Sequence, residues 1–124
     1  KRAFRAGYAY AEVSNRLKHT AFPLWVEDAR RNRGRGGMLL ALTLAALAGT
    51  VLLQSFTPLL LWLLALLALA VRSAWKARWK GGSPLTLLLY GLHSHVQQIP
   101  ILFGQLAWWR DHRQARARSL IEYK

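Results

Sequence analysis

Two histidines and two glutamines form the most distinctive polar group of this sequence. His93, His95, Gln97 and Gln98 interrupt a segment that is otherwise apolar. Residues two apart on a helix point roughly 200° apart, so the histidines can chelate one metal only from an extended or kinked backbone. Imidazole and amide groups in apolar surroundings join neighbouring helices by hydrogen bonds. We expect that role for this polar membrane patch, with substrate contact or axial ligation of a tetrapyrrole pigment through His93 or His95 as alternatives.

Groups that would support catalysis do not occur at useful spacing. The chain has no cysteine, which excludes disulfides and thiolate ligands. No carboxylates are spaced as an acid and base, and the adjacent Glu27 and Asp28 are expected to be solvated. We therefore predict no catalytic residue, no metal site and no cofactor within these residues, apart from the pigment of the alternative above.

The element that must position the patch is a long apolar stretch. Residues 36–71 carry no charge and exceed the roughly 20 apolar residues of a single membrane crossing. The polar sequence QSFTP at 54–58 interrupts them, and its proline disfavours a continuous helix. We predict a transmembrane helical hairpin over residues 38–74. A buried helical pair in a soluble protein is the alternative, although such helices normally show a polar stripe.

The charges predict how this hairpin is oriented. The net charge of +13 comes from 18 Lys and Arg against 5 Asp and Glu, and the cations flank the apolar runs. By the positive-inside rule, the basic segments face the cytoplasm. Their clusters fit a bilayer with anionic headgroups better than nucleic acid, which we consider an unlikely partner. Arginines in such clusters can also bind phosphate groups of lipids or nucleotides.

The segments outside the hairpin complete an all-α membrane protein. Residues 1–20 predict an amphipathic helix, lying in the membrane interface or packing on a neighbouring domain. Its apolar face is Ala6, Tyr10, Val13 and Leu17, and its polar face is Arg5, Glu12 and Arg16. Residues 21–37 predict an irregular basic connector, and 75–83 a basic turn.

The apolar segment at 84–109 is predicted to be broken. We expect two short helices bent near 98–100, re-entrant or interfacial, because basic residues flank both ends; a full third crossing is the alternative. Residues 110–124 predict a basic surface tail.

Two patches resemble membrane-bound family 2 glycosyltransferases, the first the segment that closes their catalytic domain just before the C-terminal transmembrane helices and the second their C-terminal membrane region. They are KRAFRAGYAYAE, with Arg2, Phe4, Arg5, Gly7, Tyr8 and Ala11, and GLHSHVQQIPILFGQL at 91–106. The resemblance implies sugar transfer from a nucleotide-sugar donor at the cytoplasmic face, with a divalent metal held by a catalytic domain absent from this chain. It also implies that Arg2 and Arg5 face a substrate or lipid phosphate.

Two further features bear on this resemblance. The processive members carry a Gln-x-x-Arg-Trp motif, whereas here Gln105 is followed by LAWWR, so polymer synthesis is not implied. The chain opens on Lys1, so we expect processing or an upstream portion. The function predicted is thus the membrane-anchoring and acceptor-side region of such an enzyme. The alternative is a small non-catalytic subunit of a larger photosynthetic or respiratory membrane complex.

Overall fold

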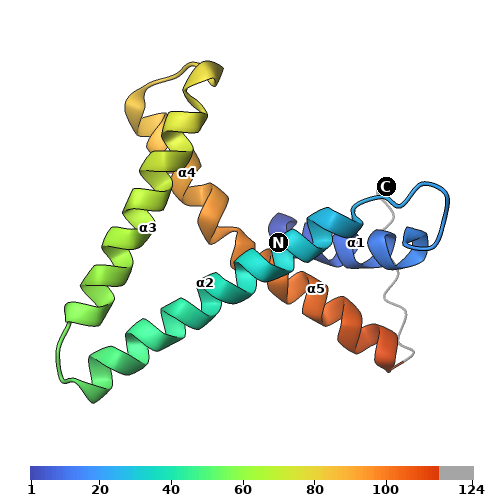
Figure 1. Cartoon of the computed structure of the whole chain (residues 1–124), viewed down its shortest axis with the longest axis horizontal. Coiled ribbons are helices and arrows are strands. Elements are labelled where there is room, and N and C mark those ends of the chain that lie inside the picture. The colour runs from blue at the N-terminus through green and yellow to red at the C-terminus, as the bar shows by residue number, and fades with distance from the viewer. Residues whose placement is uncertain (115–124) are drawn as a thin grey trace. The chain divides into compact units, whose positions relative to one another are not determined.

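The computed structural model describes residues 1–114, and these are helical without any β-strand (Figure 1). The elements are α1 (Arg2–Leu17), α2 (Val26–Leu52), α3 (Thr57–Lys76), the 3-10 helix η1 (Arg78–Lys80), α4 (Pro84–Val96) and α5 (Gln98–Arg113). The all-helical prediction is confirmed for this part of the chain, and α2 and α3 are each long and apolar enough to cross a membrane. The predicted tail at 110–124 lies outside the described residues from 115 onward.

The chain divides into two compact units. Unit 1 comprises residues 1–34 and 100–124, and unit 2 comprises residues 35–99. The division falls within α2 and near the start of α5, so each of these helices contributes to both units. The two units are described separately below.

In unit 2, α2 ends in a hydrogen-bonded turn of the Schellman type. The amide of Ser55 donates to the carbonyl of Thr50 at 3.2 Å, and that of Gln54 donates to Val51 at 3.3 Å. Gln54 has a positive φ of 48°, the left-handed conformation that this motif requires and that glycine usually supplies. The polar interruption predicted from QSFTP is therefore the turn between α2 and α3.

Helices α2 and α3 meet near this turn and diverge beyond it (Figure 1). Gly49 lies against the Pro58 ring, so closely that a Cβ there would stand 3.3 Å from the proline Cβ. The Trp62 indole nitrogen donates to the Thr43 hydroxyl at 3.1 Å. These contacts hold α2 and α3 together next to the turn that joins them. The helix that packs most extensively against α3 is α4.

Helix α3 packs antiparallel against α4 (Figure 1). The contact depends on Gly91, because a Cβ at this position would overlap the Ala70 carbonyl oxygen. Ala70 is itself fully buried. Two small residues therefore let the two backbones approach, as in helix pairs within membranes.

A capped turn starts α4. The Ser83 hydroxyl accepts a hydrogen bond from the Thr86 amide at 3.2 Å, and Pro84 occupies the first turn, where no amide donor is needed. Helix α4 ends at Val96, and α5 begins at Gln98. Pro100 falls in the first turn of α5, which explains why the segment predicted at 84–109 breaks at Gln97.

Aromatic rings and cations gather where α3 turns into α4. The Arg78 guanidinium lies 4.5 Å from the Trp75 ring centroid, and Lys80 lies 4.4 Å from that of Tyr90. Lys80 also donates to the Tyr90 hydroxyl at 3.0 Å and lies 5.6 Å from the Trp79 ring. The contacts of Lys80 hold the predicted basic turn against Tyr90 in the middle of α4.

In unit 1, two glycines bring α1 and α5 into backbone contact. A Cβ on Gly7 would overlap the Ile101 carbonyl oxygen, and one on Gly104 would overlap that of Phe4 and crowd the Tyr8 amide. Each helix therefore presents a glycine to the backbone of the other. No residue with a side chain fits at either position without separating the helices.

Two details of unit 1 correct the sequence interpretation. Residues 21–37 are not an irregular connector throughout, because α2 already begins at Val26. Glu27 pairs with Arg30 at 3.1 Å and Arg31 at 3.9 Å, side-chain pairs that favour a helix. Once the helix has begun, the glycines at 34, 36 and 37 weaken it by only about 1 kcal/mol each and do not end it.

The packed face of α1 also differs from the predicted one. Its buried residues are Gly7, Ala11 and Glu12, whereas Ala6 is exposed. Glu12 pairs with Arg16 at 2.6 Å, which compensates its burial. Small residues that allow close backbone approach therefore determine which face of α1 is packed, and the largest apolar side chains of the helix do not.

Candidate functional site

His95 joins α3 to α4 by hydrogen bonds. Its Nε2 lies 2.9 Å from the Ser73 hydroxyl oxygen and 3.2 Å from the Leu69 carbonyl oxygen. A carbonyl oxygen can only accept, so Nε2 bonds to Leu69 in the tautomer that carries the hydrogen on this atom, whereas in the other tautomer Nε2 accepts from the Ser73 hydroxyl. The ring therefore attaches one turn of α4 to one turn of α3.

The rest of the polar patch is divided between the helix surface and the α4–α5 bend. His93 is exposed, so the structure does not bring the two histidines to one point. Gln97 is the residue between the helices, and the Gln98 amide nitrogen donates to the Ser94 carbonyl at 3.3 Å. The Gln98 Oε1 atom is buried and has no hydrogen-bond partner among residues 1–114. His93, His95, Gln97 and Gln98 are thus near neighbours in sequence with different surroundings.

Arg2 and Arg5 lie in the first turn of α1 and are exposed. They are near the Phe4 backbone that contacts Gly104, so the helix that carries them is attached to α5. Within residues 1–114, neither arginine makes an ion pair. Their role in binding a phosphate stays a prediction.

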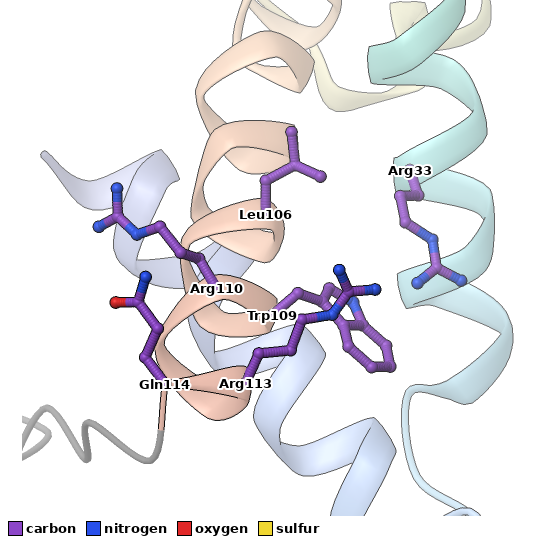
Figure 2. A pocket seen from close by; sticks show the side chains of 6 residues that line it. All are labelled: Arg33, Leu106, Trp109, Arg110, Arg113 and Gln114. Atoms are coloured by element: carbon purple, nitrogen blue, oxygen red, sulfur yellow. The ribbon is translucent and has the colours of Figure 1, made fainter.

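A groove that the sequence did not reveal lies in unit 1. It has a volume of about 460 Å³ and is lined by residues of α2, α5 and the residue after α5, namely Arg33, Leu106, Trp109, Arg110, Arg113 and Gln114. Figure 2 shows Arg33 from α2 extending toward Trp109 and Arg113 of α5, while Arg110 and Gln114 point away from Arg33. We call this set of six residues the arginine groove.

One buried hydrogen bond fixes the two walls of the arginine groove. The Gln105 amide nitrogen donates to the Ala29 carbonyl at 3.1 Å, and Gln105 is fully buried. Arg33 lies one helical turn beyond Ala29, and Trp109 lies one turn beyond Gln105. The spacing of Leu106, Trp109, Arg110 and Arg113 along one stripe of α5 was visible in the sequence, but the approach of Arg33 was not.

The groove has a positive electrostatic character. None of its lining residues is acidic. Arg110 pairs with the neighbouring Asp111 at 3.5 Å, whereas Arg33 and Arg113 have no carboxylate within 4.0 Å among residues 1–114. A site of this kind attracts anions, and the fork of a guanidinium matches the geometry of carboxylate and phosphate oxygens.

The described part of the chain offers no cluster of three or more His, Cys, Asp or Glu side chains that could hold a metal ion. Comparisons of the chain with protein-family models, with curated proteins and with solved structures gave no match.

Proposed function

We propose that this chain is a membrane-anchoring module, in which residues 36–52 of α2 and the apolar part of α3 cross the bilayer. The observation that carries this proposal is the exposure of their apolar surface. Only 17% of the apolar window in α2 and 6% of that in α3 is buried within the chain, whereas a soluble protein would bury most of its core helices. Such a surface requires another apolar environment, and lipid supplies it at any position around the helix.

The leucines of α3 illustrate the size of this effect. Leu60, Leu61, Leu63, Leu64 and Leu67 expose between 49% and 62% of their surface. Removing apolar surface from water contributes about 25 cal/mol per Å², so a helix with this many exposed leucines favours lipid strongly. We infer that the helix is surrounded by hydrocarbon over most of its circumference.

The ends of these helices support a cytoplasmic orientation for the basic segments. The cations Arg30, Arg31, Arg33 and Arg35 precede the apolar part of α2, and Arg72, Lys76, Arg78 and Lys80 follow that of α3. Trp75 near the end of α3 and Trp79 in η1 are 68% and 79% exposed, and exposed tryptophans favour the headgroup level. Anionic headgroups are the partner that fits these residues best.

Helix α4 is proposed to re-enter the membrane beside α3 without crossing it. Its 13 residues span about 20 Å, which is shorter than a hydrocarbon core of about 30 Å. The bend at Gln97 and the basic residues near the end of α5 agree with a chain that dips in and returns.

The finer proposal is that the module forms the acceptor-side region of a family 2 glycosyltransferase, and it rests on the sequence resemblance alone. A structural detail is compatible with it: Gly7 and Gly104, which contact the partner helix, lie in the two resembling patches. The proposal requires a longer gene product with an acidic, metal-binding catalytic domain upstream. The alternative, a non-catalytic subunit of a membrane complex, requires a protein partner along α2 and α3 instead.

Site-directed labelling tests the anchoring proposal, and the absence of native cysteine makes it simple. Single-cysteine variants Arg35→Cys, Lys76→Cys and Gln54→Cys are placed in sealed vesicles of one orientation and treated with a membrane-impermeant maleimide. We expect Arg35→Cys and Lys76→Cys to react from the same side and Gln54→Cys only from the other side. Reaction of the first two from opposite sides, or release of the chain by carbonate washing, would overturn the proposal.

A further inference from the structure

We infer that the arginine groove of unit 1 binds a phosphate group. This inference goes beyond the anchoring function, because the groove is built within residues 1–34 and 100–114 and does not depend on whether α2 and α3 cross a membrane. Two sources carry the same chemistry, the headgroup of an anionic lipid and a free phosphate. The experiment below distinguishes them.

The charges of the groove define the ligand class. Arg33 and Arg113 reach one groove from two helices and have no carboxylate partner within 4.0 Å among residues 1–114. Like charges held together are unfavourable, and an anion between them offsets the repulsion. Arg110 is partly compensated by Asp111, whose side chain is only 4% exposed, so it contributes less.

The rigidity of the groove favours a binding site over a loose collection of surface cations. The buried Gln105–Ala29 hydrogen bond fixes α2 on α5 one turn from Arg33 and Trp109. Trp108, which is buried, contacts Trp109 edge-on at 5.0 Å and stacks on His112 at 4.7 Å. The wall formed by Trp109 is therefore held in place before any ligand arrives, which lowers the entropy cost of binding.

The shape of the groove favours a phosphate that carries an apolar substituent. Its volume of about 460 Å³ is much larger than a phosphate ion needs. Leu106 and the Trp109 ring provide apolar walls beside the guanidinium groups (Figure 2). An amphiphilic phosphate can bond to Arg33 and Arg113 while its apolar part lies along Leu106 and Trp109.

The test measures binding of a fluorescent short-chain phosphatidic acid to the full chain in neutral detergent micelles, at fixed ionic strength. The variant Arg33→Gln/Arg113→Gln is expected to bind at least about tenfold more weakly, because charge-assisted hydrogen bonds to phosphate are lost. The matched control Lys1→Gln/Lys18→Gln removes the same charge from exposed positions that flank α1 and is expected to change the dissociation constant by less than about twofold.

Inorganic phosphate supplies the second arm. Displacement of the lipid by inorganic phosphate at millimolar concentration would identify the phosphate group alone as sufficient, and failure to displace it would identify the lipid as the source. Equal weakening in the groove variant and the control would overturn the inference, since it would indicate general electrostatic attraction. Unchanged binding in the groove variant would overturn it as well. Circular dichroism of both variants checks that the helices are retained.

Discussion

At the scale of single residues, position on the helix separates two histidines that look equivalent in the sequence. The sequence predicted that His93 and His95 point in different directions, and the structure places His93 on the surface and His95 between α3 and α4. The reason is the helical repeat: both histidines lie within α4, where residues two apart point to nearly opposite sides of the helix. The sequence alone does not reveal which histidine contacts a partner helix. That depends on where Ser73 of α3 lies relative to α4, which only the structure shows.

We expect His95→Leu to destabilise the contact between α3 and α4. The variant loses the bonds to Ser73 and Leu69, which should lower the free energy of unfolding by about 1 kcal/mol. His93→Leu is the matched control, because its side chain is exposed and a surface change typically costs within about 0.5 kcal/mol. Denaturant titration in mixed micelles, followed by circular dichroism, measures both variants.

A double-mutant cycle decides whether the bond itself is responsible. If Ser73→Ala costs as much in a His95→Leu background as alone, the two side chains act independently and our interpretation of His95 is wrong. Absorbance spectra of the same preparations test the pigment alternative. Bound tetrapyrrole that is lost in His93→Leu or His95→Leu would favour the complex subunit.

The residues of the arginine groove mark the limit of prediction at this scale. Leu106, Trp109 and Arg113 are visible as one stripe of a helix, and Arg33 is visible as one of several arginines before an apolar run. Their meeting depends on the approach of α2 to α5, which is fixed by the Gln105–Ala29 bond. Because contacts between distant segments follow from tertiary packing, a single sequence does not reveal them.

At the scale of elements, hydrophobic patterning predicted the helices well and their ends less well. The turn at QSFTP follows from local chemistry and occurs where the sequence predicts it. The cap at Ser83 starts α4 directly after the basic turn predicted at 75–83. The start of α2 at Val26 differs from the predicted connector, because the glycines at 34, 36 and 37 indicate a loop in the sequence, whereas the pairs of Glu27 with Arg30 and Arg31 favour a helix. The antiparallel α3–α4 pair was missed because its determinants, Ala70 and Gly91, are small and common residues.

We expect Gln54→Gly to stabilise the turn between α2 and α3. Gln54 adopts a φ of 48°, which costs a residue with a side chain about 1 kcal/mol relative to glycine. Part of this gain is offset because the variant loses the hydrogen bond from the Gln54 side-chain nitrogen Nε2 to the Val51 carbonyl at 3.1 Å. A net gain of about 0.5 kcal/mol is therefore expected. Thermal unfolding in neutral detergent measures it, with Gln54→Ala as the control that loses the same bond without relieving the backbone. A Gly variant no more stable than the Ala variant would contradict the expectation.

At the scale of the whole molecule, the chain behaves as two units with separate internal contacts. Unit 1 is held by the reciprocal glycine contacts of α1 and α5, and unit 2 by the α3–α4 pair. The sequence predicted the apolar hairpin within unit 2. It did not predict that the first and the last described helices form one unit. Their contact is made by backbone atoms beside two glycines, and such a contact leaves no hydrophobic pattern in the sequence.

We expect Gly7→Ile to loosen unit 1 while leaving unit 2 intact. The added side chain would overlap the Ile101 backbone, and overpacking of this kind costs about 1–3 kcal/mol. Hydrogen exchange of the full chain in neutral detergent should show faster amide exchange in α1 and in α5 and no change in α3 and α4. Gly34→Ile is the matched control in the same unit, since nothing lies within 4 Å of a Cβ built there. Unchanged exchange in α1, or equal acceleration in α3, would contradict the division.

The contact between α1 and α5 also sets an order of events during synthesis. Helix α1 leaves the ribosome well before α5 has been translated, and at about 5–20 residues per second the interval between them lasts several seconds. Throughout that interval the glycine face of α1 lacks the α5 backbone that it contacts in the folded unit, while the apolar segments between the two helices have already been synthesised. Docking of α1 is therefore a late step, and a nascent chain stalled before Gly104 would expose it to chaperones and proteases.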